Sequence, residues 1–163
     1  TVLEELSLYE LATRADAIVL ARVRRSGSRT TNVRGRLAPV TVTVLEVREW
    51  LKGSGRSEVT VIELGGTHGE GRMVVEGTPG YAPGETVVAF LARRSDGFTT
   101  LGMAQGKYRV LEANEPNRSR VLRDLRGVSL AGRDATLREG ELSRLEPLER
   151  FLARIREAVR GRR

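Results

Sequence analysis

The alternation of Val and Thr in residues 40–44 is the feature that most constrains the fold, because a period of two sends alternate side chains to opposite faces of a β-strand. The apolar side chains of residues 40–44 stand at even-numbered positions, whereas Leu45 and Val47 stand at odd-numbered ones. Trp50 returns the apolar pattern to the even-numbered positions. A slip of one residue in a strand with a buried face is typical of a β-bulge, which bends and twists the strand. Residues 57–64 contain the same slip. The sequence therefore predicts two bent strands joined by a turn, as in a small β-barrel.

A Gly-Ser-Gly run at residues 53–55 follows the single Trp of the chain and raises the question of a nucleotide-binding loop. Glu58 stands where the third glycine of G-x-G-x-x-G would be, and no helical pattern follows the run. The run is therefore predicted to be a turn. Trp50 is predicted to be buried at the end of the barrel, and Leu51 is predicted to point to the opposite side of its strand, against a flanking element.

Two helices are predicted, one at each end of the chain. Ser7 and Glu10 have the spacing of a capping box, which predicts a short helix that ends near Arg14. After Pro147, apolar residues recur with helical spacing at positions 148, 151, 152, 155 and 159. This pattern predicts an amphipathic helix that packs on the core.

The remaining apolar runs predict further strands, and the chain length of 163 residues fits one domain, residues 1–163. Continuous apolar runs with β-branched residues indicate buried strands, and shorter runs bounded by Gly, Pro, Asn or Asp indicate hairpins. The additional strands are predicted at residues 17–23, 73–76, 86–92, 98–102, 107–111 and 120–122.

The chain has a formal net charge of +7, and all but two of its 28 basic residues are Arg. Residues 22–39 hold no acidic residue and mix Arg with Ser, Gly, Thr and Asn, which predicts a basic loop. Two explanations of the Arg excess stay open: a GC-rich coding sequence, and an anionic partner that Arg binds. The candidate binding residues are Arg24, Arg25, Arg29, Arg34 and Arg36 in the basic loop, and His68 in a Gly-rich loop at residues 65–84.

The composition excludes several chemistries. The chain has no Cys and one His, which excludes disulfides, thiolate metal sites, thiol nucleophiles and zinc motifs with two histidines. No apolar run approaches the roughly 18 residues of a membrane-spanning helix. We expect no catalytic residue, no metal and no cofactor. The 21 acidic residues show no distinctive pair, and an enzyme that uses carboxylates stays open as a third alternative.

Several segments resemble the netrin-like fold of the tissue inhibitors of metalloproteinases. They include "ADAIVLARV" (15–23), "VTVTVLEVREWLKG" (40–53), "YAPGETVVAFLA" (81–92) and "DGFTTLGM" (96–103). The segments "LKG" (51–53), "GTPGYAPGETVVAFL" (77–91) and "GMAQGKYRV" (102–110) are also similar to uncharacterised exported bacterial proteins. The resemblance implies a mainly β fold. Its centre would be a five- to six-stranded OB-fold-like barrel over about residues 16–125, with a short N-terminal helix and a C-terminal helix over about residues 145–160.

The resemblance also implies export to the periplasm or the extracellular space and a binding role. The first residue, Thr1, fits either a mature exported protein or a shortened chain, and the resemblance favours the first. The inhibitors begin with a zinc-chelating Cys, so zinc chelation is not carried over to Thr1. We expect a non-enzymatic binding module that engages a protein partner, with a protease among the candidates, through residues 22–36 and 65–84 at one end of the barrel. The alternative is binding of a polyanion, either an acidic polysaccharide or a nucleic acid, through the Arg-rich loop. Aromatic residues make up only 4% of the chain, which argues against stacking on bases.

Overall fold

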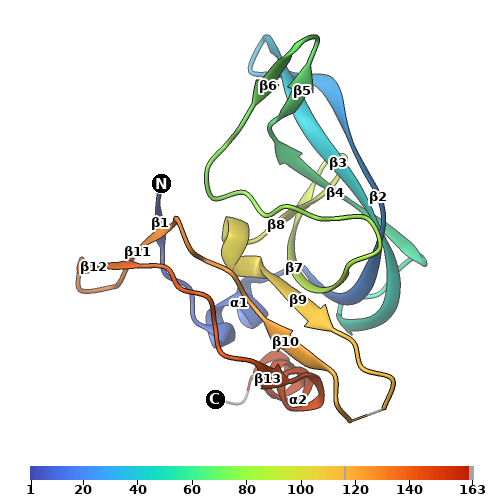
Figure 1. Cartoon of the computed structure of the whole chain (residues 1–163), viewed down its shortest axis with the longest axis vertical. Coiled ribbons are helices and arrows are strands. Elements are labelled where there is room, and N and C mark those ends of the chain that lie inside the picture. Colours follow the sequence, from blue (N-terminus) through green and yellow to red (C-terminus); the bar gives the residue numbers. More distant parts are fainter. Residues whose placement is uncertain (116, 162–163) are drawn as a thin grey trace.

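A computed structural model describes residues 1–115 and 117–161 (Figure 1). The fold is mainly β, with 51% of residues in strands and 14% in helices. The strands are β1 (Val2–Glu4), β2 (Ala17–Val33), β3 (Arg36–Lys52), β4 (Glu58–Leu64), β5 (Gly66–His68), β6 (Gly71–Met73), β7 (Thr86–Arg94), β8 (Gly97–Thr100), β9 (Lys107–Leu111), β10 (Arg120–Leu122), β11 (Ser129–Ala131), β12 (Leu137–Glu139) and β13 (Glu146–Pro147). The helices are α1 (Leu8–Arg14), the 3-10 helix η1 (Met103–Gly106) and α2 (Leu148–Val159).

Five strands form a ring of backbone pairings in the order β7, β2, β3, β4 and β8, and β8 pairs back to β7. The pairings are antiparallel except for β4 with β8, which are parallel through Val61 and Phe98. Beyond β7, the sheet continues through β9, β10 and β13. The predicted mainly β fold, with a short N-terminal helix and a C-terminal helix, is confirmed.

A bulge lies at the predicted position, but its extra residue belongs to β2 and not to β3 as predicted. Val23 pairs with Leu45 but Arg25 pairs with Val44, so Arg24 is an extra residue of β2 opposite the point where the apolar parity slips. Two further shifts in the β2–β3 register lie closer to Lys52. The similar slip in β4 is not a bulge, because β4 pairs with β3 in continuous register. Val61 and Ile62 are both buried instead, which shows that this strand is covered on both faces.

The prediction of a basic loop over residues 22–39 is wrong. β2 continues to Val33 and forms a long antiparallel hairpin with β3, which begins at Arg36. The turn residues Arg34 and Gly35 both have positive φ angles, 51° and 81°, as a type I′ turn requires. The side chain of Asn32 accepts a hydrogen bond from the Gly35 amide at 2.8 Å and fixes this turn.

The Gly-rich segment after β4 folds into a second, small hairpin. β5 and β6 pair through residues 66–73, so the strand predicted at residues 73–76 lies earlier in the chain than expected. This hairpin packs on the distal part of the β2–β3 hairpin, at the top of Figure 1. The Thr67 amide donates a hydrogen bond of 2.9 Å to the Ser28 hydroxyl across that contact. The two segments predicted as loops therefore form one packed unit.

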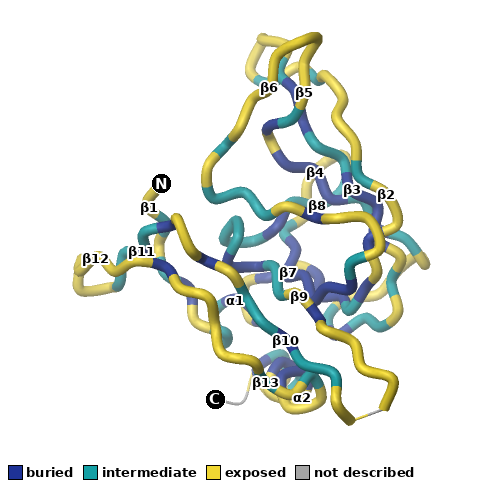
Figure 2. Tube along the Cα trace, in the orientation of Figure 1, coloured by how far each residue is buried: buried dark blue, intermediate teal, exposed yellow. Residues whose placement is uncertain are grey.

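Two separate apolar clusters lie on opposite faces of the ring strands. Figure 2 shows in dark blue that the buried residues concentrate in these strands. The cluster inside the ring consists of Ala17, Val19, Ala21, Val23, Leu45, Val59, Val61, Tyr81, Val87, Ala89 and Leu91. The other cluster joins the outer face of the sheet to both helices and contains Leu6, Leu11, Ala12, Ala15, Ile18, Leu51, Val88, Phe90, Val110, Val121, Phe151, Leu152, Ile155 and Ala158. Alternation along β2 and β7 divides the side chains between the two clusters.

The sequence predictions for the helices and for Leu51 are confirmed. Ser7 and Glu10 form the capping box of α1, and α2 buries its apolar face against the sheet. Leu51 is buried on the helix side, opposite Trp50. Trp50 itself is only partly buried, where it packs on the cluster inside the ring, so it does not form the buried plug that we predicted.

A small three-stranded sheet outside the ring was not predicted. β1 pairs in parallel with β11, and β11 pairs with β12. The side chain of Gln105 in η1 holds the segment after β1, because its Oε1 accepts from the Leu6 amide at 2.9 Å and its Nε2 donates to the Glu4 carbonyl at 2.8 Å. Residues 102–110, one of the segments in the resemblance, thus have a structural role.

Candidate binding surface and adjoining pocket

The two hairpins that project from the ring bring most of the predicted binding residues together. We call residues 25–42 and 64–74 the arm. It carries Arg25, Arg29, Arg34, Arg36 and His68, and Arg24 lies at its base in the bulge of β2. The contact between the hairpins includes the Thr30 hydroxyl, 3.2 Å from Nδ1 of His68. His68 therefore helps to hold the arm together.

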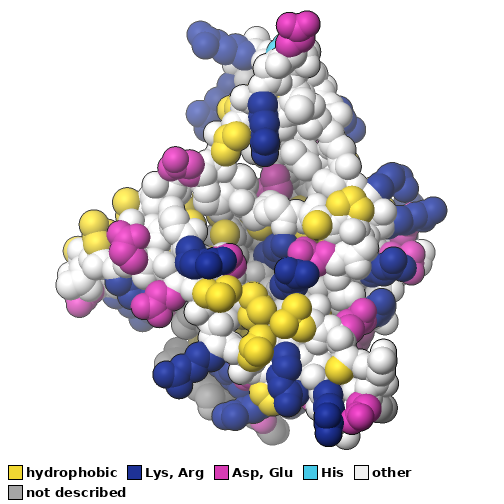
Figure 3. Space-filling view, viewed as in Figure 1, with side chains coloured by type: hydrophobic (Ala, Val, Ile, Leu, Met, Phe, Trp, Pro, Cys, Tyr) yellow, Lys and Arg dark blue, Asp and Glu magenta, His cyan; other side chains and the backbone are white. Residues whose placement is uncertain are grey.

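The arm carries more positive charge than its carboxylates balance. Arg24 is paired with Glu58, at 2.5 Å from Nη1 to Oε2, and Arg29 lies 4.0 Å from Asp96. Within the described part of the chain, four other arm residues have no ion pair: Arg25, Arg34, Arg36 and Arg72. Residues 17–45 contain no acidic residue, and Glu70 is the acidic residue of the β5–β6 turn. Figure 3 shows basic side chains along the arm and an acidic one at its tip.

Apolar side chains are exposed on the same arm. Leu37 is 72% exposed next to the tip of the β2–β3 hairpin, and Val74 is 69% exposed just after β6. Leu64 and Met73 are also exposed. The combination of Arg with exposed Leu, Val and Met, and with few acidic residues, is typical of surfaces that bind proteins.

A pocket of about 420 Å³ opens at the base of the arm, at one end of the ring. We call it the mouth pocket. Its walls are the hydroxyl side chains of Ser26, Thr41 and Thr43, the carboxylate of Glu63, and Tyr81, with residues 64–66 and 72–80 around its rim. The hydroxyls of Ser26 and Thr43 lie 3.0 Å apart.

Glu63 is the buried acid of this pocket. It is 8% exposed, and the described residues offer it no ion pair. Its oxygens accept hydrogen bonds from the Thr100 amide at 2.8 Å and from the Thr99 hydroxyl at 3.0 Å. Burial raises the pKa of Glu63 above its ordinary value, because the bonds from Thr100 and Thr99 and the charge of Arg94 only partly offset the loss of hydration.

Tyr81 closes the inner side of the pocket. Its hydroxyl lies 2.7 Å from the Thr100 hydroxyl, so it shares a partner with Glu63. Burial raises the pKa of Tyr81 well above its ordinary value, so this phenol stays protonated at neutral pH. The Lys107 ammonium lies 5.3 Å from the centre of the Tyr81 ring, and Lys107 also lines a second cleft.

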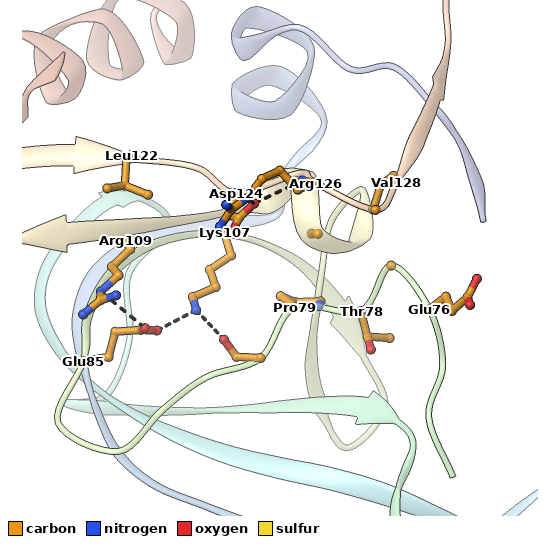
Figure 4. Close-up of a pocket in the computed structure, with 14 residues that line it drawn as sticks. Glu76, Thr78, Pro79, Glu85, Lys107, Arg109, Leu122, Asp124, Arg126 and Val128 are labelled. Carbon is orange, nitrogen blue, oxygen red and sulfur yellow. Dashed lines mark hydrogen bonds and ion pairs between the residues drawn. The ribbon is translucent and has the colours of Figure 1, made fainter. Parts of the chain in front are cut away.

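This second cleft, of about 480 Å³, lies between residues 76–80 and residues 122–128 (Figure 4). The Lys107 ammonium is 2.6 Å from Oε1 of Glu85 and donates a hydrogen bond to the Gly80 carbonyl, and Arg109 approaches Glu85 from the other side. Arg126 binds Asp124 through two nitrogens, which lowers the pKa of Asp124 to about 2. The bonds of Lys107 and Arg109 tie Gly80 and Glu85 to β9, whereas the pair of Arg126 with Asp124 is local to its own turn, so we assign all of them a structural role.

The described residues contain no group of three or more His, Asp or Glu side chains that could hold a metal ion. Residues 1–115 and 117–161 also contain no helix that is long and apolar enough to cross a membrane. None of the protein-family models matches the chain, and no curated protein or solved structure does so either. The netrin-like resemblance stays a prediction.

Sequence reasoning missed the residues that complete this surface. Arg72, Met73 and Val74 lie in the Gly-rich segment 65–84 that we predicted to engage a partner, but they were not named as binding residues, and the apolar side chains at 73 and 74 were the available signal. Glu63 could have been found from parity, since it follows Val59 and Val61 on the inward face of β4. A carboxylate at an inward position of a strand is unusual enough to mark a site.

Proposed function

We propose that this protein is a non-enzymatic binding module whose arm docks on an acidic face of a protein partner. The observation that carries the proposal is the packing of two Arg-bearing segments into one projecting surface, with four Arg side chains that have no carboxylate partner among the described residues. Such Arg side chains are free to pair with carboxylates on another molecule, and a cluster of them also accelerates encounter with an acidic surface.

The exposed apolar side chains favour a protein over a polyanion. Leu37, Met73 and Val74 would lose their water contacts against a protein surface, whereas a polysaccharide or phosphate backbone offers little apolar area to cover them. The arm has no Phe, Trp or Tyr that could stack on bases. The resemblance to exported proteins is the support for proposing a partner outside the cytoplasm, and a protease is one candidate.

Two variants separate the two kinds of partner. One replaces Arg34, Arg36 and Arg72 by Gln, and the other replaces Leu37 and Val74 by Ser. Each is immobilised beside the wild-type chain and beside Leu137→Ser, which changes a Leu that is 63% exposed away from the arm. Bound proteins from the secreted fraction of the source organism are quantified by mass spectrometry, and retention on heparin is measured in parallel.

The proposal predicts one protein that the wild type and Leu137→Ser retain and that both arm variants lose. A polyanion-binding role predicts that only the Arg variant changes, through weaker retention on heparin with a smaller salt dependence. If the Leu37 and Val74 variant retains the same proteins as the wild type, docking on a protein face is excluded.

A further inference from the structure

We propose that the mouth pocket receives an alkylammonium group, namely a lysine side chain of the protein that docks on the arm. This inference rests on the proposed function, because the pocket opens at the base of the arm and Met73, Val74 and Leu64 lie on its rim. It adds a site for one positive charge to a surface whose Arg side chains select for negative charge.

The buried carboxylate of Glu63 supplies the first argument. A carboxylate removed from water is stable only when hydrogen bonds and a countercharge replace its hydration. Glu63 has the hydrogen bonds, from the Thr100 amide and the Thr99 hydroxyl, but no ion pair within the described chain. Two carboxylate oxygens offer about four acceptor positions, so these bonds leave acceptor capacity for a ligand.

The walls of the pocket match the two parts of a lysine side chain. The apolar rim can cover the methylene stem, since Met73 and Val74 are exposed there. The hydroxyls of Ser26, Thr41 and Thr43 line the same pocket, and Thr41 is the cross-strand neighbour of Glu63. An ammonium group has three donors and no acceptor, and this set offers one charged and several neutral acceptors. The volume of about 420 Å³ leaves room for the stem and for water.

Other charged groups surround the pocket on each neighbouring element. Arg94 of β7 acts on Glu63, but its guanidinium bonds to Asp96 at 3.0 Å and to the Ile62 carbonyl at 3.4 Å. Arg72 of β6 lines the rim, where Glu76 adds a carboxylate that the N-terminal ammonium of Thr1 approaches to 3.3 Å. On the inner side, the Tyr81 phenol is neutral and Glu85 is paired with Lys107. Among the carboxylates around the pocket, Glu63 is therefore the one without a cationic partner within the described residues.

The experiment is a titration of the full chain with Nα-acetyl-lysine methylamide, followed by the NMR shift of the Thr100 amide, which bonds directly to Glu63. Nα-acetyl-norleucine methylamide supplies the same stem without charge. The variants are Glu63→Gln, which removes the charge with little change of shape, and Glu70→Gln, which makes the same change at an exposed position of the β5–β6 turn.

We expect the lysine probe to shift the Thr100 resonance and the norleucine probe to bind about tenfold more weakly, as loss of one charge-assisted contact implies. Glu63→Gln should weaken the lysine probe by about the same factor, and Glu70→Gln should leave it unchanged. Equal binding of both probes, or an unchanged affinity in Glu63→Gln, would overturn the proposal.

A second measurement needs no variant. Because burial raises the pKa of Glu63 while the contact with Thr1 lowers that of Glu76, acidification neutralises Glu63 first. The affinity of the wild-type chain for the lysine probe should fall as Glu63 becomes protonated, and a constant affinity across that range contradicts the inference. Neither measurement replaces an Arg of the arm or needs the docking partner, so the lysine pocket and arm docking can fail independently.

Discussion

Gly66 and Ser28 approach so closely that a Cβ atom on Gly66 would lie 2.6 Å from the Ser28 hydroxyl oxygen. Gly66 also has a φ of +143°, which side chains rarely tolerate. This pair is where the β5–β6 hairpin docks on the β2–β3 hairpin, next to the bond from the Thr67 amide to Ser28. The absence of a side chain at Gly66 thus allows the β5–β6 hairpin to pack directly on the β2–β3 hairpin.

Replacing Gly66 by Ala should loosen the β5–β6 hairpin and destabilise the chain by about 1–3 kcal/mol, the cost of a strained backbone angle together with a steric clash. Gly69→Ala is the matched control, since Gly69 has a φ of +60° but nothing within 4 Å of its Cβ position. Urea denaturation gives the cost, and hydrogen exchange at Thr67 gives the local effect. Equal exchange at Thr67 in both variants would show that the close approach does not hold the hairpin.

Leu51 should contribute more to stability than the larger side chain of Trp50. Leu51→Ala should cost about 2–4 kcal/mol, because it removes methyl groups from the cluster between the sheet and the helices. Trp50→Ala should cost about 2 kcal/mol, less than a fully buried Trp, because Trp50 is partly exposed and packs on one side only. Denaturant unfolding of both variants measures the order. A larger cost for Trp50 would restore the sequence prediction of a buried plug.

The stability contributed by Glu63 should depend on pH in the opposite sense from that of an ion-paired carboxylate. Its pKa is raised in the folded state, so the folded chain holds the proton more tightly than the unfolded chain does. Its contribution is complete below the unfolded pKa and is lost as the pH rises through the folded pKa. The wild type should therefore gain stability relative to Glu63→Gln on acidification from about pH 7.5 to about pH 4.5.

Urea denaturation of the wild type, Glu63→Gln and Glu70→Gln at both pH values checks this expectation. Using differences between variants removes the contribution of the other carboxylates. The difference in free energy of unfolding between the wild type and Glu63→Gln should change with pH in favour of the wild type at low pH. A difference that stays constant, or that shifts in favour of Glu63→Gln at low pH, is incompatible with a desolvated Glu63.

Removing one partner of the Lys107–Glu85 ion pair should destabilise the fold more than removing both partners. Lys107→Met leaves the largely buried Glu85 with Arg109 at 3.8 Å, so we expect a loss of about 2–4 kcal/mol. In the double variant Lys107→Met with Glu85→Leu, no buried charge remains, and part of that loss should return. Thermal and urea unfolding measure both. Costs that simply add would mean that the two side chains act separately.

Much of the fold could be predicted because its signals are local. The capping box of α1, the spacing of apolar residues in α2 and the apolar run of β7 each contain their own pattern. The two strands after η1 were also predicted with their observed bounds, 107–111 and 120–122, and they form an antiparallel pair. In each case a buried face repeats with the period of the element.

The arm could not be predicted in the same way, because residues 24–32 are polar and have almost no buried face. Their strand conformation depends on pairing with β3, so tertiary contact and not local periodicity determines it. The turn at Arg34 and Gly35 lacks the usual Asn-Gly or Asp-Gly signal. The parallel pairing of Val2 with Ser129 is missed for a related reason, since contacts between distant residues leave no local pattern.

The candidate site was predicted in part. The sequence identified the Arg residues and His68 but treated them as members of two loops, and it missed the apolar side chains that favour a protein partner. The mouth pocket depends on residues from four separate segments, which one-dimensional patterns do not bring together. Only the parity of Glu63 with Val59 and Val61 pointed to it.

Site-specific photocrosslinking from the arm tests the central claim most directly. A photoreactive phenylalanine analogue replaces Leu37 on the arm in one chain and Leu137 on β12 in another, since both are exposed. We predict that residue 37 crosslinks one protein in the secreted fraction of the source organism. That product should diminish when Arg34, Arg36 and Arg72 are replaced by Gln, and residue 137 should not form it. Equal crosslinking from both positions, or none from residue 37, would contradict docking through the arm.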